Sequence, residues 1–165
     1  MTAKVMGGVF MLSCVAVISV WAQSREQNRV AYWKAADLRS TEVNALVPQA
    51  KAAASGVGAK TYLDLSTHKV LVSHREKPGV PELHKAETDV FIVQSGGGVL
   101  QVGGEMVDRK DSPAGATGSS IKGGEKYTMG VGDVINIPPN VPHNWLLAPG
   151  ESVTYLVVKA EEPHQ

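Results

Sequence analysis

The chain has 165 residues and carries 16 basic and 16 acidic side chains. This length suits one compact domain, and the balanced charge argues against a surface that binds nucleic acid or another polyanion. We therefore expect a single domain without a nucleic-acid partner.

The first 22 residues have the pattern of an export signal. Lys4 precedes an uncharged, mostly apolar run from Val5 to Trp21, and Val20-Trp21-Ala22 offers the small residues that a signal peptidase reads. We expect cleavage after Ala22 and a periplasmic or secreted protein that is free of the membrane; retention of the run as an anchor is the alternative. Cys14 lies inside this leader, so the mature chain would have neither a disulfide nor a thiolate metal ligand.

Residues 23–58 are predicted to form an N-terminal extension with one helix. Its apolar residues follow the helical spacing i, i+3, i+4, i+7, at Val43, Leu46, Val47 and Ala50. Ser40 or Thr41 is available as an N-cap. We expect Pro48 to kink or restart the helix, and Gly56 and Gly58 to end it.

Short segments rich in Val, Ile, Tyr and Thr dominate the chain after the helix. The expected strands are Lys60–Leu65, His68–Arg75, Asp89–Gln94, Gly98–Val102, Lys126–Met129, Asp133–Ile137, His143–Leu147 and Ser152–Lys159. Such a series, without helices between the strands, is typical of an antiparallel sandwich or barrel. We interpret Gly96-Gly97-Gly98 as a hairpin turn and Asp108–Gly124 as a long surface loop, or alternatively a lid over a pocket. Residues 161–165 are expected to be a disordered tail.

Two segments of the strand-rich region carry histidines and carboxylates at regular spacings. They read Glu82-x-His84-x4-Asp89-x6-Gly96 and Gly132-x5-Pro138-x-Asn140-x2-His143-x3-Leu147. Residues two apart on a strand share one face, so Glu82 and His84 could hold one ion together. The ordinary alternatives are a packed or solvent-facing histidine, a solvated carboxylate in a loop for Glu82, and a turn residue for Asp89.

These segments resemble the two motifs of the cupin family, G-x5-H-x-H-x3-4-E-x6-G and G-x5-P-x-G-x2-H-x3-N. The resemblance implies the family's small double-stranded β-helix, or jelly-roll, barrel over residues 59–160, and so an all-β fold with one N-terminal helix. It also places Glu82, His84, Asp89 and His143 at the family's metal-ligand positions. Asn140 stands where the family has Gly, and both residues tolerate a left-handed turn.

A site with two imidazoles and two carboxylates favours manganese or iron(II), with zinc or nickel possible. Asp89 has a side chain one methylene shorter than that of Glu, so it could stay outside the coordination shell and orient a water or a histidine. Glu82, His84 and His143 would then form a facial triad. Glu82 is the candidate catalytic residue, because a carboxylate beside a cation can act as a general base; Asp89 is the alternative base.

Two functions from different classes fit this site. The first is a metal enzyme of the cupin kind that acts on a small oxygen-rich molecule by Lewis-acid isomerase or lyase chemistry, or by dioxygenase chemistry. The second is a non-catalytic module that binds a sugar or a carboxylate. The resemblance also implies a possible homodimer.

One further wall of the pocket depends on which residues of strand 68–75 face inward. Alternation offers either Val70, Val72 and His74 or Leu71, Ser73 and Arg75. An inward Arg75 would clamp a substrate carboxylate, whereas an outward one would be an ordinary surface arginine.

Overall fold

The computed structural model describes residues 30–161, and its helices and strands belong to the unit formed by residues 33–165. The predicted leader lies outside the described residues, as does all of the predicted tail except Glu161. Glu161 ends the last strand and so is not disordered as expected. No helix in the described part of the chain is long and apolar enough to cross a membrane.

One helical segment precedes the strands, as predicted. It consists of α2 (Ala35–Thr41), the π-helical η1 (Glu42–Leu46) and α3 (Val47–Ala52). The strands that follow are β1 (Val57–Asp64), β2 (His68–Arg75), β3 (Glu82–His84), β4 (Glu87–Val102), β5 (Glu105–Val107), β6 (Lys110–Asp111), β7 (Gly115–Thr117), β8 (Ser120–Lys122), β9 (Glu125–Gly130), β10 (Val134–Ile137), β11 (His143–Leu146) and β12 (Val153–Glu161).

Pro48 changes the hydrogen bonding of the helix, as predicted. The Val47 N–H donates to the Glu42 carbonyl, five residues back, and α3 begins with Pro48 in its first turn. The N-cap prediction is wrong, because the helix already begins at Ala35 and Ser40 lies inside it. The predicted apolar pattern began only at Val43. It missed α2 because no residue of α2 is buried.

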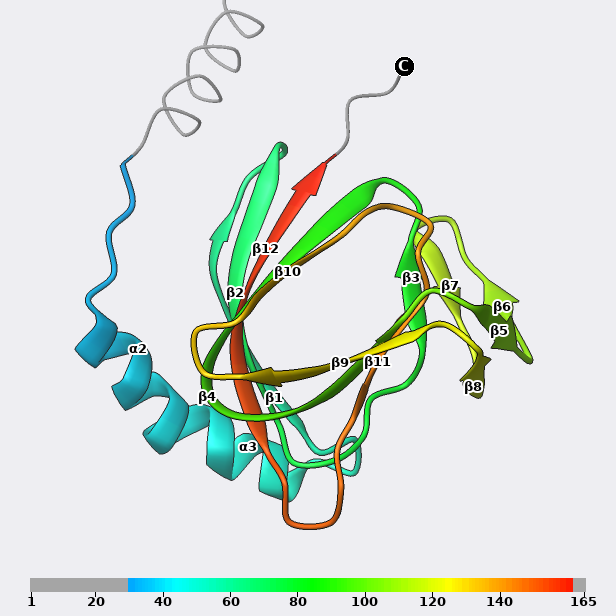
Figure 1. Cartoon of the computed structure of the whole chain (residues 1–165). Helices are drawn as coiled ribbons and strands as arrows, with labels where there is room; N and C mark the ends of the chain where they lie inside the picture. The colour runs from blue at the N-terminus through cyan, green and yellow to red at the C-terminus, as the bar shows by residue number, and fades with distance from the viewer. Residues whose placement is uncertain (1–29, 162–165) are drawn as a thin grey trace, which may run out of the picture. The chain divides into compact units, whose positions relative to one another are not determined.

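The helix packs against the outer face of one sheet (Figure 1). Leu46 and Ala50 are each 1% exposed, whereas Val43, expected on the same face, is 59% exposed. Glu42 accepts hydrogen bonds from Ser95 and, at 2.8 Å, from Thr154. The apolar face and this carboxylate together attach the helix to the sheet.

Ten of the strands form two antiparallel layers that share β4, and β5 and β8 pair with each other in a separate small sheet. The first half of β4 pairs with β12 and β10, and β2 and β1 continue that layer, here called sheet A. The second half of β4 pairs with β9 and β11, and β3, β7 and β6 continue the other layer, sheet B. The predicted all-β barrel is confirmed, and within residues 30–161 one helical segment precedes it.

The glycine triplet Gly96–Gly98 is not a hairpin turn, and the two strands predicted around it are one strand, β4. Gly96 has φ +66°, and its pairing with β12 is irregular just before it. A side chain at Gly97 would meet the Met129 carbonyl. The glycines therefore let one strand cross from one sheet to the other. Sequence alone does not distinguish such a bend from a hairpin turn, because glycines favour both.

The segment 108–124, expected to be a loop, contains short strands. β7 pairs with β3, which carries Glu82 and His84, and β6 pairs with β7. Ala116 and Ile121 are buried. This segment thus extends sheet B beside the candidate site instead of lying over it as a lid.

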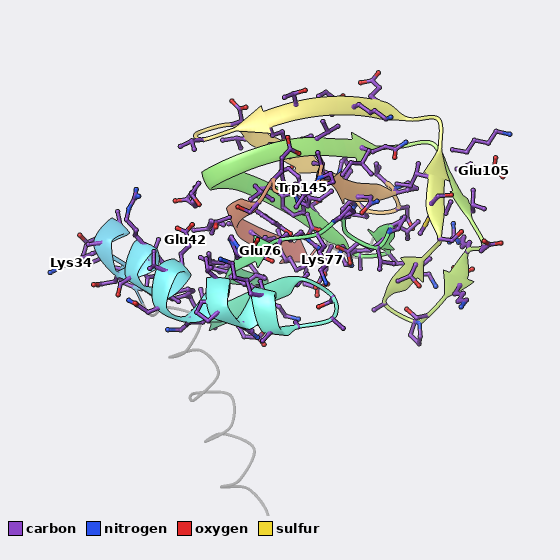
Figure 2. All side chains as sticks on the ribbon, turned by 90° about the horizontal axis from the view of Figure 1, so that it is seen from below. Lys34, Glu42, Glu76, Lys77, Glu105 and Trp145 are labelled. Atoms are coloured by element: carbon purple, nitrogen blue, oxygen red, sulfur yellow. The ribbon has the colours of Figure 1, made fainter. Side chains whose placement is uncertain are left out.

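Cross-strand register fixes which residues face the barrel interior. The cluster of Phe91, Val93, Trp145, Tyr155 and Val157 forms the core between the sheets, with Leu71 packed against it. Figure 2 labels Trp145 among the strands of the barrel. Ser73 pairs with Tyr155 and Arg75 with Val153, so Leu71, Ser73 and Arg75 face inward. The other face of β2 turns toward the helix, where His74 hydrogen-bonds Thr154 at 2.7 Å.

Candidate metal centre

Two sheets meet at the candidate site, which lies at one end of the barrel. Glu82 and His84 come from β3, and His143 of β11 pairs with Glu82 in register. Asp89 lies in the first half of β4, on sheet A. The turn that leads to β11 contains Asn140 with φ +62°, the left-handed conformation expected from its motif position. The structure therefore brings the four sequence-predicted residues together.

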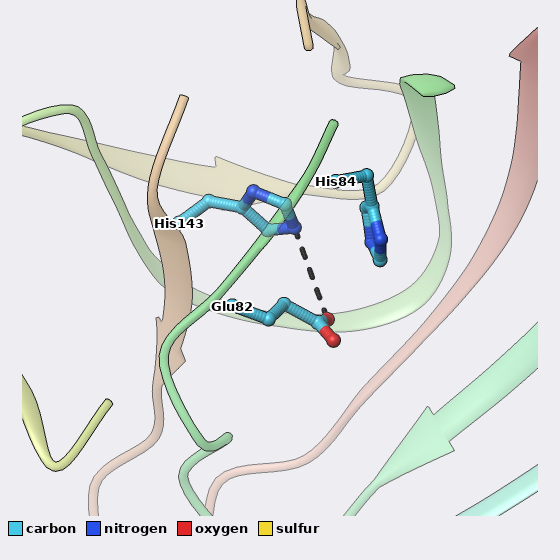
Figure 3. A group of neighbouring side chains, drawn as sticks. All are labelled: Glu82, His84 and His143. Carbon is cyan, nitrogen blue, oxygen red and sulfur yellow. Dashed lines mark ion pairs between the residues drawn. The ribbon is translucent and has the colours of Figure 1, made fainter. Parts of the chain in front are cut away.

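Three of these side chains converge on a single point (Figure 3). One ligand atom each from Glu82, His84 and His143 lies within 4.8 Å of the other two. His143 Nε2 is 3.8 Å from Glu82 Oε1. A separation of 3.8 Å fits two donor atoms that share an ion about 2.1 Å from each.

Asp89 lies behind this triad and touches both histidines. Its Oδ2 is 3.3 Å from His84 Nε2 and 3.5 Å from His143 Nε2. Asp89 is only 2% exposed, whereas the Glu82 side chain is 39% exposed. The buried carboxylate lies against both imidazoles, and the exposed one faces solvent.

His143 has an open ligand atom. Its Nδ1 is 3.1 Å from the Val141 carbonyl oxygen, which fixes Nδ1 as the N–H donor and leaves Nε2 with the lone pair. Nε2 is buried and has no hydrogen-bond partner among residues 30–161. A buried polar atom without a partner is costly, and a metal ion would satisfy it.

Lys159 and Glu87 also belong to the site, although the sequence motifs do not include them. Lys159 Nζ is 2.7 Å from Asp89 Oδ1 and 2.9 Å from His84 Nε2. Glu87 Oε2 is 3.3 Å from Lys159 Nζ and 3.8 Å from His84 Nδ1. The alternation of buried residues along β12 (Val153, Tyr155, Val157) is the signal that would have placed Lys159 inside.

The local charges shift three pKa values. When His84 is protonated it donates a hydrogen bond to the Asp89 carboxylate, which raises the pKa of His84 against burial and the charge of Lys159. Burial lowers the pKa of His143, against the charge of Glu82. Burial alone would raise the pKa of Asp89, but His84 and Lys159 together lower it. Asp89 is thus kept ionised, and His143 is kept neutral with a free lone pair.

The barrel interior beyond the site is filled. Phe91 packs edge-on against His143 with ring centroids 5.9 Å apart, and Phe91 and Trp145 stack behind it. Arg75 faces inward but donates to the Tyr155 hydroxyl at 2.8 Å, at the other end of the β2 and β12 register. It is not a surface arginine, and it does not lie beside the four predicted ligands.

Fold and site together define a double-stranded β-barrel protein with a candidate His/carboxylate metal centre at one end. Structures named as cupins are among its structural neighbours. One is a cupin-2 domain protein of Rhodospirillum rubrum, with 13% identity over 66% of this chain and 62% of that chain and a TM-score of 0.48. Another is a cupin-like protein of Thermotoga maritima, with 21% identity over 63% and 68% and a TM-score of 0.46.

A Streptomyces nucleoside dehydratase is also similar. Its structure with uridine has 16% identity over 68% of this chain and 76% of that chain, with a TM-score of 0.48. No family model and no curated protein matches the chain. These identities and TM-scores are too low to transfer a neighbour's substrate to this protein.

Proposed function

We propose that this protein is an exported cupin that binds one divalent metal ion through Glu82, His84 and His143 and acts on a small oxygen-rich molecule. The observation that carries the proposal is the buried, unpartnered Nε2 of His143, which points at a carboxylate and a second imidazole. Two imidazoles and a carboxylate fit manganese or iron(II) best, while zinc and nickel also accept this set.

The bound ion would supply Lewis acidity, or a platform for dioxygen if it is iron or manganese. Glu82 is the residue best placed to accept a proton from a bound molecule, because its side chain is the most exposed of the four. The Val141 carbonyl holds the imidazole of His143 in position, and Glu87 Oε2 lies 3.8 Å from the Nδ1 of His84. The filled interior confines the substrate to the rim of the barrel, which favours a small molecule.

Metal content of purified variants tests the site. The protein and its His84→Ala, His143→Ala and His68→Ala variants are loaded with each of the four metals, desalted and analysed for bound metal. His68 is the matched control, because it lies on the same barrel but contacts Thr67. We expect stoichiometric metal in the wild type and in His68→Ala, and its loss in the other two with an unchanged circular dichroism spectrum. A wild type that holds none of the four metals contradicts the proposal.

Chelation separates an enzyme from a binding module. Turnover of an oxygen-rich substrate that disappears with chelator and returns with iron or manganese supports the enzyme. Binding of a sugar or carboxylate that chelator leaves unchanged supports the non-catalytic alternative.

Export is part of the same proposal and rests on the leader pattern of residues 1–22. N-terminal sequencing of the protein recovered from the cell envelope and medium tests it. A first residue of Gln23 supports export, whereas a chain that retains Met1 in a membrane fraction supports the anchor.

A further inference from the structure

Lys159 enters the candidate metal centre from the sheet opposite the predicted triad. It follows the buried residues Tyr155 and Val157 on the inward face of β12, and it pairs in register with Asp89 on β4 and with Lys69 on β2. Its side chain is 20% exposed, and its ammonium is therefore held largely among other side chains. Lys69 lies at the same end of the barrel and, among residues 30–161, forms ion pairs with Glu87 and Asp64, at 3.8 and 3.9 Å, and with neither His84 nor Asp89.

The position of the Lys159 ammonium conflicts with a metal ion on His84. An ammonium group only donates hydrogen bonds, so the His84 Nε2 at 2.9 Å must accept one through its lone pair. That lone pair is the one a metal ion bound at Nε2 would need. The same ammonium also neutralises Asp89, which is 2% exposed and 2.7 Å away.

A second anionic partner for Lys159 lies close by. Glu87 Oε2 is 3.3 Å from Nζ, so a small movement of the ammonium toward Glu87 would uncover both His84 Nε2 and Asp89. The free-energy cost of this movement is low, because the Lys159 ammonium has a carboxylate partner in both positions.

We propose that Lys159 is the resident cation of the metal-free site, and that a divalent ion must displace its ammonium from His84 and Asp89 in order to bind. This inference rests on the proposed metal-binding function. Lys159 then sets the metal affinity of the site: it balances the carboxylates when no ion is bound and opposes the ion when one arrives.

Titration of metal-free protein with manganese, by calorimetry, tests the competition. Lys159→Met keeps the length of the side chain and removes the charge, and Lys69→Met makes the same change on the neighbouring strand without contact to His84 or Asp89. We expect Lys159→Met to bind manganese about tenfold more tightly than the wild type, because a close, partly buried charge is removed. Lys69→Met should stay within about threefold, because an exposed charge is screened by solvent.

Nitrogen NMR of the imidazole rings in the metal-free proteins gives a second readout. With Lys159 present, the Nε2 of His84 accepts a hydrogen bond. In Lys159→Met it is free to donate to Asp89 Oδ2 at 3.3 Å, so the His84 Nε2 signal should move from the acceptor to the N–H range. The Lys69→Met spectrum should match that of the wild type.

The two readouts separate the inference from the proposed function. If the wild type binds manganese and Lys159→Met binds it equally or more weakly, the inference is wrong while the metal site stands. If neither protein binds any metal, the proposed metal function is wrong, and the NMR signal of His84 alone tests the role of Lys159. An unchanged His84 signal in Lys159→Met contradicts the proposal that Lys159 is the resident cation. A shifted signal supports it.

Discussion

At the scale of single residues, the site separates its carboxylates by exposure. Asp89 is buried and contacts Lys159 and the two histidines, whereas Glu82 is partly exposed and lies 3.8 Å from the Nε2 of the neutral His143. A carboxylate that is not committed to a close protein partner is free to bind an ion or accept a proton. This difference makes Glu82 the most direct residue with which to test the site.

Glu82→Gln should weaken metal binding about 10- to 1000-fold, because the amide keeps the shape of the side chain but loses the negative ligand. The measurement is the manganese dissociation constant from calorimetry. Glu105→Gln is the matched control, because Glu105 is exposed on β5, away from the site (Figure 2). Equal affinities for the two variants would remove Glu82 from the coordination shell.

The two histidines should respond to pH with opposite signs in the metal-free protein. The pKa of His143 is lowered from 6.5, so its contribution to stability is present above pH 6.5 and is lost as the pH falls toward the lowered value. The pKa of His84 is raised from 6.5, so its contribution is present below pH 6.5 and is lost as the pH rises through the raised value.

Urea unfolding in chelator from about pH 8 to about pH 5 measures both effects. Relative to the wild type, His143→Gln should lose less stability on acidification and His84→Gln should lose more. If the plots of unfolding free energy against pH are parallel for the two variants, the pKa values of the two histidines are not shifted in opposite directions.

At the scale of elements, the bend in β4 determines whether both sheets can share one strand. Gly96 has φ +66°, and a side chain there would meet the Ser152 carbonyl. We expect Gly96→Ala to lower the free energy of unfolding by about 2 kcal/mol or more, from the left-handed conformation and the clash together.

Gly130→Ala is the control for this bend. Gly130 lies on β9, its φ is not in the left-handed region, and an added Cβ would have no heavy atom of the described chain within 4 Å. Gly130→Ala should lower the free energy of unfolding by less than about 1 kcal/mol in the same urea titration. If Gly96→Ala costs no more than Gly130→Ala, the crossing does not depend on the glycine conformation.

The N-terminal helix should contribute to the stability of the barrel. Leu46 is 1% exposed, and Leu46→Ala should cost about 2–5 kcal/mol. Val43→Ala on the same helix, at a side chain that is 59% exposed, should cost less than about 1 kcal/mol. Both values come from urea unfolding, and similar losses would mean that the helix does not pack as described.

Strand alternation is a local property, so the sequence predicted an antiparallel barrel and placed Glu82 and His84 on one face. The grouping of these residues with Asp89 and His143 rests on the resemblance to the two cupin motifs, because only the fold joins strands that are so distant in sequence. The course of β4 was not predictable in this way, since a glycine triplet has the same composition in a hairpin and in a bend. Lys159 lay beyond the motifs, because only the register of β12 against β4 brings it to Asp89. The sequence also left open which face of β2 points inward, and only the packing of Leu71 against the core identifies that face.

At the scale of the whole molecule, the site connects the two sheets. Sheet B supplies Glu82, His84 and His143, and sheet A supplies Asp89 and Lys159. An ion in the cluster would be attracted by carboxylates on both layers, so its binding would stabilise the folded barrel as a unit. The unfolded chain cannot keep these residues together, because they are distant in sequence.

Metal binding should therefore raise the global stability by linkage. Manganese at about 100 times its dissociation constant should add about 2.7 kcal/mol to the free energy of unfolding, provided that the unfolded chain does not bind it. The measurement is urea unfolding with and without metal, after confirming that the transition is two-state. His143→Ala should remove the increment, and His68→Ala should retain it. Because Lys159→Met binds the ion more tightly, it should show a larger increment than the wild type at the same metal concentration. An increment that survives His143→Ala would place the stabilising ion elsewhere on the protein.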